Sequence, residues 1–128
     1  MATRDPALAL QDAVYVAIKD VANGSVFYDV PDGQSLPYVY FGDDDITADY
    51  DSSGDFFDVT ANVEVFAADK ISLKTLVAEV VAQLDRQISI DGFTVLEWRV
   101  GFAHYRTMED GLTQQASLEF DYLIAPGS

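Results

Sequence analysis

The sequence contains no cysteine and a single histidine, His104. The absence of cysteine excludes disulfide bonds, thiolate metal sites and cysteine nucleophiles. With one histidine, the chain cannot build a zinc site with two histidine ligands or a relay of several histidines. Any chemistry must therefore come from carboxylates, hydroxyls and a few cations.

Positive charge is scarce, since 7 Lys and Arg residues stand against 22 Asp and Glu residues, for a net charge of −15. A chain this acidic repels the phosphate backbone, which disfavours direct binding of nucleic acid through a basic face. No apolar run approaches the ~20 residues of a membrane-spanning helix. The start, Met1–Pro6, lacks a basic-then-apolar signal pattern, so we expect a protein made and retained in the cytosol. Its 128 residues predict one domain, residues 1–128, and 49% apolar residues suffice for a core.

A first helix is predicted to begin at Asp5 and Pro6, because an N-cap residue followed by proline favours helix initiation, and to end at Asn23-Gly24. Apolar residues recur at helical spacing along it: Leu10, Ala13, Val14, Ala17, Ile18 and Val21. Three residues lie off this stripe and are available either to flanking core or to a partner: Leu8, Tyr15 and Val16.

Two short β-favouring segments follow, Ser25–Val30 and Leu36–Phe41, and then a strand over Phe56–Ala67 that alternates apolar and polar residues. Between the last two lies a predicted loop, Asp43–Asp55, with six carboxylates in thirteen residues. In Leu36–Phe41, the residues expected on both sides of the strand are apolar. We therefore expect one face of that strand to be covered by something beyond the helices, most economically a second copy of the protein.

A second helix is predicted over Lys70–Gln87, capped by Asp69, followed by two strands, Phe93–Arg106 and Leu112–Ile124, joined by a turn at Glu109-Asp110-Gly111. In the first strand we expect one shared face: Leu96, Trp98, Val100 and Phe102. In the second we expect another: Ala116, Leu118, Phe120 and Tyr122. The predicted fold is α+β, a mostly antiparallel sheet of four to five strands with two helices packed on one face, in the order helix-strand-strand-strand-helix-hairpin. Residues 125–128 read as a frayed tail.

The acidic segment invites a test for calcium, because residues 49–54 open like a calcium-binding loop. Such a loop needs a bidentate Glu at its twelfth position and helices on both sides. Counted from Asp49, the twelfth position is Thr60, inside a predicted strand. We therefore predict no metal site, and expect a solvated loop that a partner could order.

No catalytic pattern is present. Nothing marks a pair of carboxylates as buried or poised for acid–base work. His104 has no nucleophile-elbow motif to accompany it, and the glycines fall at turns rather than in a phosphate-binding pattern. We therefore predict that the protein is not an enzyme and uses no cofactor.

The order of these segments resembles that of a family of tail completion or tail terminator proteins, found in tailed phages and in gene transfer particles. The resemblance covers Pro6–Ala125. It rests on the opening Asp-Pro-Ala-Leu-Ala-Leu-Gln-Asp-Ala-Val-Tyr and on three later segments: Val26–Gly33, Leu36–Gly42 and the closing strands around Phe102–Thr107 and Leu118–Leu123.

This resemblance implies a structural virion protein at the neck of a siphovirus-like particle, made in the host cytoplasm. It implies a ring, usually of six subunits, that caps the tail tube, stops its polymerisation and joins it to the head connector or stopper. DNA would pass through the lumen as cargo, with no membrane involved. Such a cap needs shape and symmetry rather than nucleophiles. The alternative is a head–tail joining adaptor or stopper, or a minor tail protein, that stays monomeric until docked.

In such a ring, the functional residues to predict are those at the contacts between subunits. Six copies of a chain of net charge −15 carry a charge of −90, so contacts between subunits must overcome a repulsion that salt weakens. Acidic residues along the lumen would keep DNA from adhering during passage. We expect one or two of the scarce cations to pair with acids of a neighbouring subunit. The candidate interface residues are six acids, four cations and two tyrosines: Asp43, Asp44, Asp45, Asp49, Asp51, Asp55, Lys70, Lys74, Arg99, Arg106, Tyr15 and Tyr40.

Overall fold

The computed structural model describes residues 6–42, 45–49 and 56–127. Two helices, a short 3-10 turn and six strands succeed one another along the chain. They are α1 (Pro6–Ile18), η1 (Val21–Gly24), β1 (Val26–Phe27), β2 (Tyr38–Phe41), β3 (Asp45–Asp49), β4 (Phe56–Ala67), α2 (Lys70–Leu84), β5 (Phe93–Thr107) and β6 (Gln114–Pro126).

The strands form one sheet in the order β1-β2-β4-β6-β5, with β3 also paired to β4. All pairings are antiparallel except that of β1 with β2. β2 and β3 use successive stretches of the same side of β4, since β2 pairs with Val63–Phe66 and β3 with Phe56–Thr60. The predicted α+β class is confirmed. The sheet has six strands rather than four to five, because part of the expected acidic loop forms β3.

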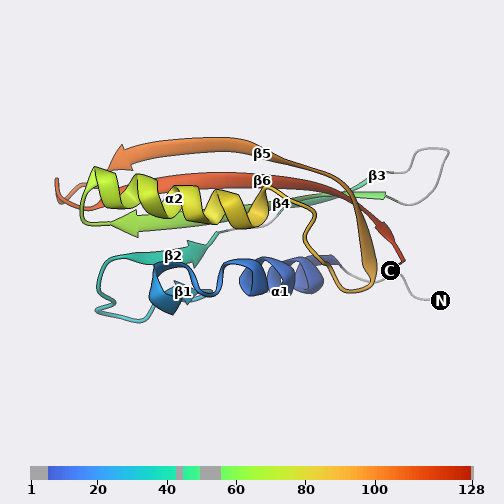
Figure 1. Ribbon diagram of the computed structural model, residues 1–128, viewed down its shortest axis with the longest axis horizontal. Coiled ribbons are helices and arrows are strands. Elements are labelled where there is room, and N and C mark those ends of the chain that lie inside the picture. The colour runs from blue at the N-terminus through green and yellow to red at the C-terminus, as the bar shows by residue number, and fades with distance from the viewer. Residues whose placement is uncertain (1–5, 43–44, 50–55, 128) are drawn as a thin grey trace.

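Both helices lie against one face of the sheet, as predicted. In Figure 1, α2 runs in front of β4 and β6, while α1 lies with β1 and β2 at the edge away from β5. Apolar side chains of both layers meet in one core. Its fully buried members include Leu10, Val14, Ile18, Leu73, Val80, Leu84, Val63, Leu118, Phe120 and Tyr122. No helix of the described residues covers the opposite face of the sheet, which is called the open face below.

The helix boundaries follow local chemistry. The Asp69 side chain accepts a hydrogen bond from the Ser72 backbone N–H at 2.8 Å, so α2 begins at Lys70 as predicted. It ends at Leu84, three residues before the expected Gln87. The first helix is also shorter than predicted, because Ala22 and Asn23 adopt positive φ angles of 54° and 56°. The chain therefore leaves the α-helix after Ile18 and makes the single turn η1.

The closing hairpin has the predicted turn. Asp110 accepts hydrogen bonds from the backbone N–H groups of Leu112 and Thr113, both at 2.8 Å, and Gly111 takes a positive φ of 73°. The second strand starts at Gln114 rather than at the expected Leu112. Its predicted apolar face is confirmed, since Ala116, Leu118, Phe120 and Tyr122 are all buried.

The prediction that one face of β5 is shared by Leu96, Trp98, Val100 and Phe102 is wrong. Two irregularities, between Val95 and Glu97 and between Val100 and Phe102, each shift the pairing with β6 by one residue. Trp98 and Val100 do share a face, opposite Tyr122 and Phe120. Leu96 falls within the first irregularity and is exposed, and Phe102 is paired with Glu119, on the other parity of β6.

Candidate interaction surfaces

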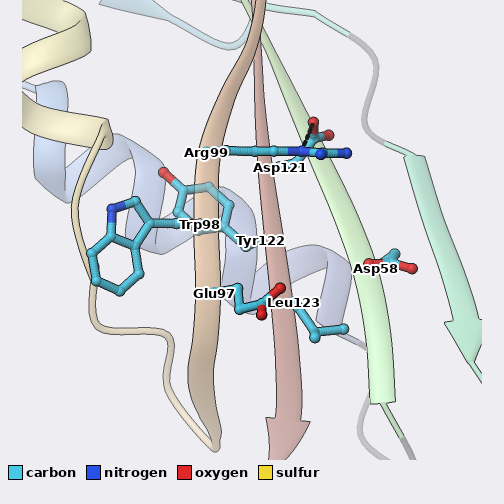
Figure 2. A pocket seen from close by; sticks show the side chains of 7 residues that line it. All are labelled: Asp58, Glu97, Trp98, Arg99, Asp121, Tyr122 and Leu123. Atoms are coloured by element: carbon cyan, nitrogen blue, oxygen red, sulfur yellow. Dashed lines mark hydrogen bonds and ion pairs between the residues drawn. The ribbon is translucent and has the colours of Figure 1, made fainter.

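Asp121 links three strands on the open face. Its carboxylate accepts a hydrogen bond from the Thr60 hydroxyl on β4 at 2.7 Å and faces the Arg99 Nε on β5 at 3.4 Å. Figure 2 shows Arg99 and Asp121 pointing toward one another, with the Trp98 ring projecting from the other side of β5. The Arg99 side chain is 79% exposed, so this ion pair contributes little to stability and leaves the guanidinium in solvent.

A second polar network crosses the same three strands at the other end of the open face. The Arg106 Nε donates to the Gln115 side-chain oxygen at 2.6 Å. The Gln115 amide and the Ser117 hydroxyl both donate to the same Glu64 carboxylate oxygen, at 3.0 Å and 2.7 Å. Gln115 is only 7% exposed, so Glu64 satisfies a polar group that water barely reaches.

Three aromatic rings meet where α1 crosses the β1–β2 edge. The ring centroids of Tyr28 and Phe41 are 4.7 Å apart and stacked, and the Tyr15 ring lies 5.5 Å and 6.2 Å from them. Burial and the negative charge of Asp12 raise the pKa of Tyr28. Tyr15 and Tyr28 are nevertheless more than one-third exposed. We call these three residues with Asp12 the aromatic corner.

A different surface lies where α2 runs beside β5. The Lys74 ammonium sits 5.9 Å from the centroid of the Tyr105 ring, within reach of a cation–π interaction. Lys70 lies one helical turn before Lys74. Ile71 is 81% exposed, and the Trp98 and Tyr105 rings are 40% and 44% exposed. We call Lys70, Ile71, Lys74, Trp98 and Tyr105 the α2–β5 edge.

The predicted interface residues are thus spread over several surfaces. Lys70 and Lys74 belong to the α2–β5 edge, and Tyr15 belongs to the aromatic corner. Arg99 and Arg106 make contacts within their own chain. Tyr40 is half-buried and lines a shallow hollow with Gly42, Asn62, Glu64 and Ser117 on the open face. Of the six acids, Asp45 and Asp49 belong to β3, while Asp43, Asp44, Asp51 and Asp55 lie outside the described residues.

Sequence reasoning missed the partners of these residues. Tyr28 and Phe41 belong to segments predicted as short strands, and nothing in the sequence showed that a parallel β1–β2 pair would bring them beside Tyr15. Ile71 offered a weak signal, because it is a large apolar residue off the buried stripe of α2.

The described part of the chain shows no cluster of metal-ligating side chains. Within residues 6–42, 45–49 and 56–127, no group of three or more His, Asp or Glu side chains could hold a metal ion. The carboxyl pKa values of Asp69 and Asp110 are lowered by hydrogen bonds from their own turns. Among the helices described, none is long and apolar enough to cross a membrane.

Comparison with known proteins finds solved structures of similar fold and a matching family model. The fold is similar to a chain of the structure "Virion of native gene transfer agent (GTA) particle", with a TM-score of 0.83 and 22% sequence identity, covering 98% of this chain and 100% of that chain. At this identity the likeness establishes a shared fold. No curated protein matches the sequence. The family model for "Tail completion protein gp17" matches residues 7–125, and the chain therefore belongs to the tail completion protein gp17 family.

Proposed function

We propose that this protein is a tail terminator whose copies close into a ring of six that caps the tail tube. In this role it stops polymerisation of the tube and joins it to the head connector or stopper, with DNA passing through the lumen. The observation that carries the proposal is the family match over residues 7–125. Membership of that family makes the protein a structural virion component that takes part in tail completion.

The architecture supports a role based on shape. A cap must match the last ring of the tube on one side and refuse a further ring on the other, so its two sides must differ. Here one face of the sheet is covered by α1 and α2, whereas the open face carries polar side chains held in two hydrogen-bond networks. A two-layer fold of this kind offers different surfaces without any added domain.

The charge of the open face suits a surface that lines a channel for DNA. Asp58, Glu97 and Glu119 are exposed carboxylates on it, and such charges repel phosphate. We propose that this face lines the lumen. The variant Asp58→Asn/Glu97→Gln/Glu119→Gln keeps the side-chain sizes and removes three charges per subunit. Slower DNA ejection from particles that carry it is the expected result, and unchanged ejection kinetics would overturn this assignment.

The test of the terminator role uses the purified chain alone and mixed with tubes of the tail tube protein. Six copies of the 14.0 kDa chain weigh about 84 kDa, which native mass measurement resolves from the monomer. We expect rings with a central hole in negative-stain images and tubes that stop growing when the protein is added. Tubes that keep growing while the chain stays monomeric on them would overturn the proposal in favour of an adaptor that docks as a single copy.

A further inference from the structure

The positive charge of this acidic chain is concentrated at one edge of the sheet. The helix α2 contains two lysines and one glutamate, and β5 contains two arginines and one glutamate, so each carries a net charge of +1. The other helix and strands are neutral or negative, with −1 on α1 and −2 on each of β3, β4 and β6. The two arginines of β5 make their contacts on the open face, so the cations of the α2–β5 edge are Lys70 and Lys74. Within the described residues, this edge is a surface of an otherwise acidic molecule that can attract acidic groups.

The aromatic corner lies at the opposite end of the sheet. It belongs to α1, β2 and the segment after β1, whereas β5 is the last strand on the other side of the order β1-β2-β4-β6-β5. It offers ring faces together with the Asp12 carboxylate. Two more apolar side chains of α1 are exposed nearby in sequence, Leu8 and Val16. Cations bind favourably to aromatic faces and to carboxylates, so this corner complements the α2–β5 edge in chemistry.

Neither end of the sheet is built to pair with another strand. β1 has only two residues, and β5 is interrupted by two irregularities and carries charged side chains. These features discourage the addition of a strand to a sheet edge. A contact made by either end must therefore rely on side chains.

We propose that the α2–β5 edge of one copy docks on the aromatic corner of the next, placing Lys74 against the Tyr15, Tyr28 and Asp12 side chains. The proposal rests on the ring proposed above and names the surfaces that close it. Because the two surfaces differ and lie at opposite ends of the sheet, repeated docking is head-to-tail, which is the type of contact that generates a ring. Their charge complementarity identifies the occupant as a second copy of this chain.

The first experiment reverses one charge. Lys74→Glu places a carboxylate against the acidic corner and should weaken association of the copies roughly tenfold or more, because like charges at an interface are costly. The matched control is Arg86→Glu, which makes the same change in net charge just beyond the other end of α2 and should leave association within about twofold of the unmodified chain. The variant Lys74→Glu/Asp12→Lys exchanges the two charges and should restore assembly. Circular dichroism melting confirms that each variant is folded.

The second experiment uses the absence of cysteine from the chain. Lys74→Cys and Asp12→Cys are prepared as separate proteins and as one double variant, then treated with a short bismaleimide cross-linker. Each single variant alone should remain monomeric on a denaturing gel. A mixture of the two should give a dimer, and the double variant should give a ladder that ends at the closed ring.

Both experiments are run on the free chain and on chain bound to tail tubes, so that a ring that closes only on the tube is also measured. If rings form but Lys74→Glu leaves them intact and the cysteine pair does not cross-link, the assignment of surfaces is wrong and the terminator role stands. If Lys74→Glu impairs tube binding but not ring formation, the α2–β5 edge contacts the tail tube rather than a second copy, and the inference is again wrong. If no ring forms in either setting, both proposals fall.

Discussion

The Tyr122 hydroxyl on β6 donates a hydrogen bond to the backbone carbonyl of Leu84, the last residue of α2, at 2.7 Å. Both residues are buried. The bond fixes the end of the helix over the central strands and satisfies a carbonyl that has no partner within the helix. It therefore joins the two layers at the C-terminal end of α2.

Removal of that hydroxyl should loosen the end of α2. Tyr122→Phe keeps the ring and leaves the Leu84 carbonyl buried without its donor, which should cost about 1–2 kcal/mol of unfolding free energy. Urea denaturation followed by circular dichroism measures the loss. Tyr105→Phe, which alters an exposed tyrosine, is the control. Equal stability of Tyr122→Phe and the unmodified chain would contradict the assigned role.

Alkaline pH should destabilise the chain through the same group. Burial raises the pKa of Tyr122 well above its ordinary value of 10.0, so the folded state favours the protonated phenol. The stability that this contributes is complete below pH 10 and is lost as the pH rises above it, because the unfolded chain then releases the proton. The unfolding free energy measured between pH 8 and 11 should fall more steeply for the unmodified chain than for Tyr122→Phe. Parallel curves would show that Tyr122 does not titrate differently on unfolding.

The hydrogen bonds that Glu64 accepts should contribute to the stability of the fold, although Glu64 lies on the open face. Glu64→Ala removes the acceptor shared by Gln115 and Ser117 and leaves the buried Gln115 amide unpaired, at a cost of about 1–3 kcal/mol. Glu119→Ala, an exposed acid on the same face, should change the denaturation midpoint far less. If the two substitutions cost the same, Glu64 acts only as a surface charge.

The N-cap of α2 predicts an acid sensitivity. Hydrogen bonds from Ser72 lower the pKa of Asp69, so its stabilising effect is present above its ordinary pKa of 3.8 and is lost as the pH falls through the lowered value. Asp69→Ala should lower the melting temperature by a few degrees at neutral pH, whereas Asp69→Asn, which keeps an acceptor oxygen, should lower it less. The difference between Asp69→Ala and the unmodified chain should shrink in acid.

Much of the fold was predictable because its strongest signals are local. The alternation along Phe56–Ala67 and the apolar stripe of the second helix each bury one face, and both match the structure. Asp69 and Asp110 were read as a cap and a turn residue, and each makes the backbone hydrogen bonds that such a residue makes.

The failures have physical reasons. β3 was not predicted because aspartate disfavours strands, and because its pairing depends on residues of β4 that lie seven to fifteen positions further along the chain. The faces of β5 were misassigned because a one-residue irregularity reverses the alternation after it. Gly101 was the available signal, because a glycine inside a strand often marks an irregularity. A Cβ atom there would lie 2.7 Å from the Asp121 carboxylate, so a larger residue would require that side chain to shift. The aromatic corner depends on strand order, which periodicity does not reveal.

The separation of charge across the sheet also bears on how two copies of the chain approach one another. Among the described helices and strands, α2 and β5 each carry +1, whereas α1, β3, β4 and β6 are negative, so charge is separated along the order of the sheet. In the proposed ring, this separation would favour a head-to-tail approach of two molecules once they come within a Debye length, roughly 8 Å at physiological ionic strength. Such orientation would raise the fraction of productive collisions, so that strongly like-charged copies could associate in the proposed arrangement while repelling one another in the rest.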